Sequence, residues 1–260
     1  MPRRRIPLEV CIDSLDSANA AAPLLAPGDR FEVCSSLLAG GGLTPSIGLV
    51  LVLKELYPDI AIFVMIRPRS GSFVYTHAEV EIMAADIKAF RQAGVDGIVV
   101  GCLHPDGEVD METTQLLADV AEPLPVTFHR AFDVTPDWQR AADDISSIRG
   151  ITRILTSGHA ATAIQGAAEL DALFRYVPRH ITVTPASGLN ADSLAELWRR
   201  APLISEAHLS ASGPYNPGPT PTLARGVALG FGSGDEWRLN PRKLEGVVDL
   251  CERYAERHGP

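Results

Sequence analysis

Two short segments near the start of the chain contain the same pair of reactive residue types. Residues 8–12 read Leu-Glu-Val-Cys-Ile and residues 31–34 read Phe-Glu-Val-Cys. Side chains alternate between the two faces of a β-strand, so the glutamate and cysteine of each segment share the face opposite the apolar residues. Carboxylates and thiols on neighbouring strands can transfer protons or bind a soft metal ion. The four residues are Glu9, Cys11, Glu32 and Cys34.

The elements that must position these residues are eight β-rich segments, which alternate with longer amphipathic segments. This alternation is typical of βαβ units and a parallel sheet. An open doubly wound sheet usually has about five or six strands and often a Gly-x-Gly-x-x-Gly turn, and neither feature is found here. We therefore predict an α/β fold, a single parallel (β/α)8 TIM-type barrel formed by residues 1–260, with its core at about residues 8–212. The predicted strands are residues 8–12, 30–34, 60–66, 97–101, 125–129, 153–156, 181–184 and 206–209.

The chain beyond the eighth predicted strand has a different composition. Residues 213–236 are rich in proline and glycine, and we interpret them as a variable surface loop in preference to a lid over the barrel. Residues 241–257 predict an extra C-terminal helix. Three other helices are expected to begin where a capping residue precedes apolar periodicity, at Thr44-Pro45, Asp137 and Asp192.

Polar residues follow almost every predicted strand. Active sites of β/α barrels lie at the mouth formed by the C-terminal ends of the strands. Carboxylates buried there would be costly without cations beside them. We interpret the cluster as a functional site, and the alternative is an ion-pair network that only closes the barrel. Besides the two glutamates and two cysteines, the residues assigned to it are Ser35, Arg67, Arg69, His129, Arg130, Ser157, Gly158, Gly188 and His208.

Composition limits the classes of partner. The 260 residues include 23 basic and 32 acidic side chains, and the formal net charge of -9 repels nucleic acid and anionic membranes. The longest strongly apolar run, residues 47–53, is far shorter than the roughly 20 residues of a membrane span. Glu9 and Asp13 interrupt the apolar stretch that a signal peptide requires, so we expect a cytoplasmic protein. Its four cysteines have no zinc-finger spacing and are expected to be reduced.

Several motifs, in a fixed order, resemble those of the CutC family. They are Leu-Glu-Val-Cys at residues 8–11, Phe-Glu-Val-Cys-Ser-Ser-Leu at 31–37, Gly-Gly-Leu-Thr-Pro-Ser at 41–46, Val-Met-Ile-Arg-Pro-Arg at 64–69, Phe-His-Arg-Ala-Phe-Asp at 128–133 and Ile-Leu-Thr-Ser-Gly at 154–158. The resemblance implies a cytoplasmic β/α barrel, usually a homo-oligomer, with a role in copper homeostasis. The chain departs from the family after the seventh strand, where Pro-Ala-Ser-Gly at residues 185–188 replaces a glycine-rich turn.

The first hypothesis for the mouth is binding of Cu(I) by Cys11 and Cys34. Adjacent strands lie about 4.8 Å apart, so thiols at matching heights could share one ion. Thiolates favour Cu(I) over harder cations. The alternative is that each cysteine simply fills space in the core, as buried cysteines commonly do. No organic cofactor is predicted.

The second hypothesis is an enzyme that acts on a small anionic metabolite, either phosphorylated or carboxylated. The glycine-rich residues 40–46 lead into a helix start, where free backbone N–H groups favour an anion. Arg67, Arg69 and Arg130 could clamp such an anion.

The acid or base of such an enzyme would be His129 or His208, with Glu9 or Glu32 as its partner. The sequence contains no P-loop, nucleophile elbow or His-Glu-x-x-His motif, so the reaction type stays open. In a third hypothesis the protein is a scaffold whose mouth is chemically inert.

Overall fold

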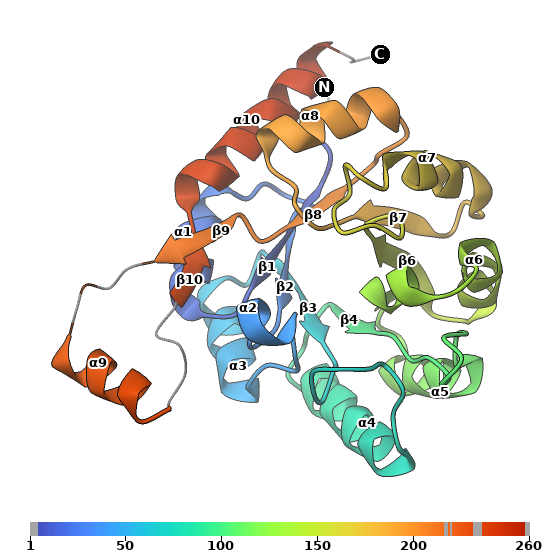
Figure 1. Cartoon of the computed structure of the whole chain (residues 1–260), viewed down its shortest axis with the longest axis horizontal. Helices are drawn as coiled ribbons and strands as arrows, with labels where there is room; N and C mark the ends of the chain where they lie inside the picture. The colour runs from blue at the N-terminus through green and yellow to red at the C-terminus, as the bar shows by residue number, and fades with distance from the viewer. Residues whose placement is uncertain (1–4, 216–217, 219, 231–235, 258–260) are drawn as a thin grey trace.

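Strands and helices alternate along the chain and form a barrel in the computed structural model, which describes residues 5–215, 218, 220–230 and 236–257 (Figure 1). Eight parallel strands form one sheet in the order β7-β6-β5-β4-β3-β2-β1-β8, nearly closed on itself, with helices outside it. The predicted β/α barrel is therefore confirmed. Its strands are β1 (Leu8–Ile12), β2 (Arg30–Val33), β3 (Ala61–Met65), β4 (Gly97–Val100), β5 (Val126–Phe128), β6 (Ile151–Thr156), β7 (Thr182–Pro185) and β8 (Ala207–Leu209).

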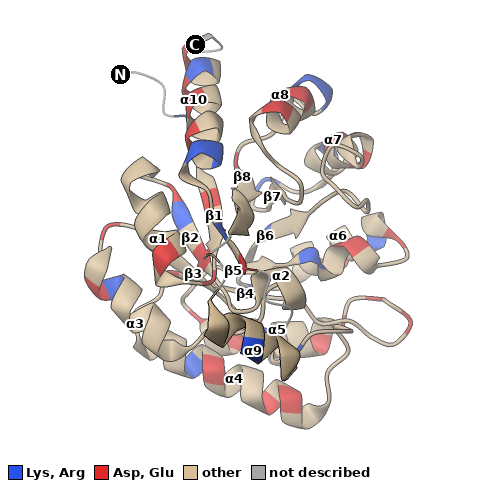
Figure 2. Ribbon diagram, turned by 60° about the vertical axis from the view of Figure 1, so that its left-hand side comes forward, with Lys and Arg blue, Asp and Glu red and all other residues tan. Residues whose placement is uncertain are grey.

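The helices surround the sheet, and charged residues lie along the outer ones, such as α4, α6 and α8 (Figure 2). None of the helices in the described part of the chain is long and apolar enough to cross a membrane. The helices are α1 (Leu15–Ala21), α2 (Leu37–Gly40), α3 (Ile47–Leu56), α4 (His77–Gln92), α5 (Met111–Ala121), α6 (Trp138–Ser147), α7 (Ala167–Tyr176), α8 (Ala191–Arg200), α9 (Pro221–Ala228) and α10 (Pro241–Arg257), with 3-10 turns η1 (Ala22–Leu24) and η2 (Arg130–Val134).

Helix starts agree with the sequence at α6, where Asp137 caps the first turn, and differ at α3 and α8. Helix α3 is capped by Ser46, because the Thr44 hydroxyl instead accepts a hydrogen bond from the Arg67 backbone N–H at 2.9 Å. Helix α8 is capped by Asn190, two residues before the expected Asp192. The predicted C-terminal helix is present as α10.

The proline- and glycine-rich excursion contains more regular structure than the surface loop that we expected. Strand β9 (Ser212–Tyr215) pairs antiparallel with β10 (Glu236–Leu239), and α9 lies between them in the chain. A two-stranded ribbon tolerates Pro214 because each strand has an open edge where no N–H donor is needed. Residues 216–217, 219 and 231–235 of the excursion lie outside the described residues.

Alternation along the strands separates two layers of side chains. Leu8, Val10 and Ile12 of β1 are buried in the core between the sheet and the helices. The opposite face carries Cys11, Phe63 and Met65, which belong to a second buried cluster inside the barrel. The β1–β2 register pairs Cys11 with Glu32, so the two thiols are offset by two residues and do not stand at the matching heights that we considered.

A buried ion-pair network fills the lower part of the barrel. Arg30 of β2 donates from Nε to Glu9 and from Nη1 and Nη2 to Glu206 at 3.1 and 3.0 Å. Arg153 of β6 also donates to Glu206, at 3.2 Å. Both guanidinium groups lie 5.2 Å from the centre of the Phe63 ring. The network therefore links strands on opposite sides of the barrel.

The same network spans the seam of the sheet. Strands β7 and β8 are its two ends, and no backbone ladder joins them among the described residues. Thr184 of β7 donates from its hydroxyl to Glu206, which immediately precedes β8. This side-chain hydrogen bond closes the barrel where backbone pairing does not.

Replacing Arg30 should reveal how much the fold depends on this network. The substitution Arg30→Met leaves Glu9 and Glu206 buried without their main partner, and we expect the free energy of unfolding to fall by about 3–5 kcal/mol. Chemical denaturation monitored by circular dichroism measures the change.

Arg175→Met is the matched control, because Arg175 pairs with Asp171 on the exposed face of α7. Such pairs contribute about 0–1 kcal/mol. Equal effects of the two substitutions would show that the buried network contributes no special stability.

Candidate functional site

A cavity of about 740 Å³ opens at the mouth of the barrel, where strands β1 to β8 end. Its volume lies within the range of about 300–1,000 Å³ that is usual for small-molecule sites. One side is lined by Cys11, Glu32 and His208, and another by Arg67 and His129. The cavity therefore brings the thiol and carboxylate residues together with the basic residues. Cys11 and His208, for example, are 197 positions apart in the sequence.

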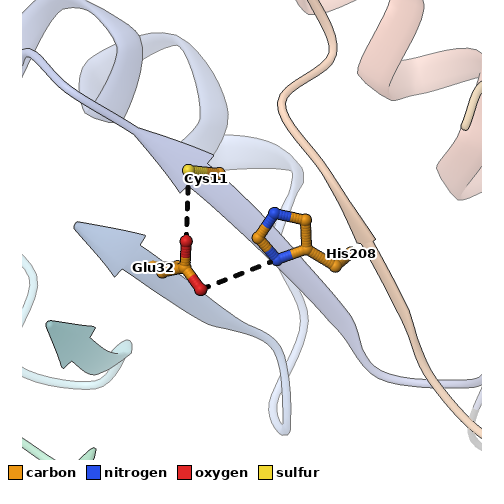
Figure 3. Close-up of side chains that lie close together, drawn as sticks. All are labelled: Cys11, Glu32 and His208. Carbon is orange, nitrogen blue, oxygen red and sulfur yellow. Dashed lines mark hydrogen bonds and ion pairs between the residues drawn. The ribbon is translucent and has the colours of Figure 1, made fainter. Parts of the chain in front are cut away.

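The thiol side of the cavity holds two cysteines in contact. Cys11 Sγ lies 3.7 Å from Cys34 Sγ and donates to Glu32 Oε1 at 3.5 Å. His208 Nδ1 lies 3.9 Å from Glu32 Oε2 (Figure 3). Cys11, Glu32 and His208 each offer one possible metal-ligand atom. These three atoms lie within 4.8 Å of one another, close enough to share a metal ion.

Burial and neighbouring charges set the protonation of this group. Burial would raise the pKa of Glu9, but Arg30 and His208 overcome it and lower that pKa to about 2. Burial raises the pKa of Glu32 to about 7, with His208 opposing the shift and Glu9 adding to it. Burial disfavours protonated His208, yet Glu32 and Glu9 raise its pKa above the ordinary value. Glu32 and His208 thus both keep their protons to a higher pH than usual.

The thiol of Cys11 also holds its proton firmly. Its hydrogen bond with Cys34, its burial and the nearby Glu32 together raise the pKa of Cys11 well above the ordinary value. A metal ion that binds the Cys11 sulfur must therefore displace a proton.

The other side of the cavity centres on Arg67 and His129, which both contact Phe73. The Arg67 Cζ atom lies 4.8 Å above the Phe73 ring, and the His129 ring lies 5.0 Å from it. Burial, with the Arg67 charge, lowers the pKa of His129 to about 3, so this imidazole is neutral at physiological pH. Gly101 at the end of β4 leaves room for the ring, because an added Cβ would lie 2.4 Å from it.

Arg130 lines the cavity, but its positive charge is paired with Asp133. Its Nε donates to Asp133 at 2.7 Å and its Nη2 to Ser157 Oγ at 2.8 Å. Asp133 also accepts from the Ser157 backbone N–H at 3.0 Å. Ser157 therefore holds the loop after β6 and positions Arg130. Ser157 itself does not line the cavity, whereas Arg130 does.

Several residues assigned from the sequence lie elsewhere in the structure. Arg69 pairs with Glu79 at the start of α4, outside the cavity. Ser35 donates to the Thr44 carbonyl at 2.9 Å, and Gly158 packs on the Gly166 backbone. Glu9 is buried below the cavity, 2.8 Å from His208 Nδ1. Gly188 does line the cavity, in a left-handed turn with φ of 70°.

The glycine-rich residues 40–46 do not form the anion cradle that we expected. The Gly40 and Gly42 N–H groups donate to the Ser36 carbonyl, at 2.7 and 3.5 Å. The carbonyls of Gly40 and Gly42 face Arg67 and accept from its Nη1 at 2.7 and 3.3 Å. This loop therefore holds a cation in place, because the Gly40 and Gly42 N–H groups are already used and the carbonyls of both residues accept from the guanidinium.

Sequence reasoning missed Arg30, which neutralises the buried Glu9. We expected Arg67, Arg69, His129 and Arg130 to supply the positive charge beside Glu9 and Glu32, and none of them pairs with either carboxylate among the described residues. His208, expected as a possible partner of Glu9 or Glu32, does lie beside both. Strand alternation could have found Arg30, since residues 30, 32 and 34 share one face. The same alternation places Met65 inside the barrel, where it packs in the cluster of Cys11 and Cys34.

The fold and the site define a parallel β/α barrel with a polar mouth cavity that can hold a metal ion or a small ligand. Comparison with known proteins agrees with this fold. Residues 6–213 match the model of the CutC family, and the chain belongs to this family.

Relatives and a solved structure support the assignment. A CutC family protein of Rhizobium meliloti is 39% identical over 94% of this chain and 95% of its own length. A human protein named copper homeostasis protein cutC homolog is 40% identical over 78% of this chain and 72% of its own length. The crystal structure of a CutC protein from Streptococcus agalactiae superposes with a TM-score of 0.72 at 30% identity, covering 79% of this chain and 98% of that chain. Self-association, which the resemblance implies, stays a prediction.

The neutral state of His129 predicts how stability depends on pH. The unfolded chain protonates this imidazole near the ordinary pKa of about 6.5, whereas the folded protein does so only near 3. Between these values the unfolded state binds more protons, so His129 makes the wild type less stable as pH falls. The variant His129→Asn should lack this contribution, and its free energy of unfolding should fall less steeply, by about 1.4 kcal/mol per pH unit between pH 6 and 4.5.

Urea denaturation of both proteins across this pH range measures the difference in slope. Parallel pH profiles would contradict the neutral, desolvated state of His129. The comparison isolates one residue because both proteins keep every other titratable group.

Proposed function

We propose that this chain binds Cu(I) between Cys11 and Cys34 at the mouth of the barrel and takes part in copper homeostasis. The observation that carries the proposal is the 3.7 Å distance between the two sulfur atoms. A metal–thiolate bond is about 2.3 Å long in zinc sites, so two sulfurs that share an ion must lie within about 4.6 Å. The two thiols meet this condition without any movement of their strands.

The surroundings of the thiols favour a soft ion. Met65 packs in the same buried cluster, and its thioether, like thiolates, favours Cu(I) over harder cations. Cys34 has a relative exposure of 0% and Cys11 of 4%, so a bound ion would be shielded from water. This combination of two thiols and a thioether in an apolar pocket suits a large polarisable ion of low charge.

Glu32 and His208 complete the site on its polar side. Glu32 accepts a hydrogen bond from Cys11. A ring nitrogen of His208 lies within 4.8 Å of the Cys11 sulfur. When a metal ion displaces the Cys11 proton, Glu32 is the nearest group that can accept it. We infer that these two residues exchange protons with the metal site.

The compartment and the relatives are consistent with this role. All four cysteines are free, which favours the cytoplasm because disulfides are rare there. The human relative is named a copper homeostasis protein, and this chain shares 40% identity with it. The role in copper homeostasis rests on this relationship, and the binding residues rest on geometry.

A Cu(I) titration under reducing conditions against a colorimetric chelator tests the proposal. We expect the wild type to bind one ion per chain. The double variant Cys11→Ser, Cys34→Ser should lose more affinity than the roughly 10–100-fold that is usual for loss of a group next to a metal ligand. The hydroxyl of serine keeps the size of the side chain and removes the soft ligand.

The control is Cys251→Ser, which changes a cysteine that is equally buried but lies in α10. It should bind Cu(I) like the wild type. Equal affinity of the double variant and the wild type would overturn the proposal, and so would an equal loss in Cys251→Ser.

A further inference from the structure

Arg67 is a buried cation without a counter-ion in the described part of the chain. Its relative exposure is 7%, and its Nη atoms donate only to the carbonyls of Gly40, Gly42 and Gly71. The neighbouring basic residues differ, because Arg69 pairs with Glu79 and Arg130 with Asp133. Carbonyl oxygens satisfy hydrogen bonds but leave the net charge in place, and an uncompensated buried charge is costly. Some anion should therefore balance Arg67.

Arg67 and His129 each have a buried N–H without an acceptor. Among the described residues, neither Arg67 Nε nor His129 Nε2 has an acceptor in hydrogen-bond geometry, and the Tyr75 hydroxyl, which interacts with Arg67, is likewise without such a partner. His129 Nδ1 accepts from the Ala131 backbone N–H at 3.1 Å, which places the ring proton on Nε2. Buried polar groups are almost always satisfied, so two such donors in one cluster indicate an acceptor from outside the chain.

The two donors belong to one side of the mouth cavity. Both residues line it, and both contact the ring of Phe73, which lines it as well. The two nitrogen atoms themselves lie just beneath the cavity surface, so a ligand oxygen reaches them when the Arg67 and His129 side chains turn toward it. At the rim, Arg242 and Lys243 at the start of α10 add positive charge. The cavity therefore offers a charged donor, a neutral donor and an aromatic surface to one ligand.

We propose that the mouth cavity binds a small organic anion whose carboxylate or phosphate oxygens accept hydrogen bonds from Arg67 and His129. The anion balances the charge of Arg67 and satisfies both unpartnered donors. Its body lies toward the centre of the cavity, whose volume of about 740 Å³ exceeds the space that a single inorganic anion fills. This subsite is separate from Cys11 on β1 and from Cys34, which directly follows β2.

Isothermal titration calorimetry at low ionic strength tests the subsite with inorganic phosphate and malonate as probes, and with neutral malonamide as the uncharged reference. We expect one or both anions to bind and malonamide not to bind. The stronger anion distinguishes a phosphate ligand from a carboxylate ligand. Absence of binding for both anions would overturn the proposal.

Two substitutions at one position separate the hydrogen bond from the charge. In His129→Asn, the amide oxygen can replace Nδ1 as acceptor for Ala131, but no donor reaches the place of Nε2. Affinity for the anion should fall by about 10–100-fold, the usual cost of losing a hydrogen bond to a charged group. In His129→Gln the longer amide restores a donor there, and affinity should recover in part. An unchanged affinity in His129→Asn, with a thermal unfolding curve like that of the wild type, would overturn the role of His129.

Two controls exclude other sources of binding. Arg242→Gln removes an exposed cation at the rim and should weaken binding less than about fivefold. A loss as large as in His129→Asn would indicate non-specific attraction and would contradict a built site. The double variant Cys11→Ser, Cys34→Ser should keep wild-type anion affinity, and a loss there would place the anion at the thiols. These outcomes do not depend on whether copper binds.

Discussion

The bidentate hydrogen bonds from Arg30 to Glu206 are the interaction on which the rest of the barrel depends. Glu206 also accepts from Arg153 of β6 and from Thr184 of β7, and Arg30 holds Glu9 of β1. One buried carboxylate therefore joins strands that no backbone ladder connects among the described residues. A barrel closed in this way has a fixed shape at its mouth, because the strand ends cannot move apart without exposing these charges.

The same network determines what the mouth can do. Burial raises the pKa of Glu32 to about 7, because Arg30 is occupied by Glu9 and Glu206 and offsets the burial only in part. When Glu32 is ionised, its negative charge faces His208, and both residues lie next to the Cys11 thiol. Structural ion pairing deep in the barrel thus leaves Glu32, which exchanges protons near neutral pH, in contact with the thiol of the proposed metal site.

The two sides of the cavity suit opposite ions. The thiol side holds groups that can release protons, the Cys11 thiol and Glu32, and it can then receive a positive ion. The side of Arg67 and His129 has donors in excess of acceptors and can receive an anion. The two proposals therefore describe separate ligands that the one cavity can hold at the same time, with the metal at its floor and the anion against the Phe73 wall.

The sequence by itself determined the fold and the direction in which the reactive strand residues point. Eight β-rich segments predict the barrel, and alternation places Glu9, Cys11, Glu32 and Cys34 inside it, because strand periodicity is a local property. Only the tertiary structure decided which charges pair. Arg30 and Glu206 are separated by 176 positions, and Arg69, two residues after Arg67, turns away to Glu79. Such choices depend on barrel closure and loop conformation, so local sequence cannot reveal that Arg67 is a buried cation without a counter-ion among the described residues.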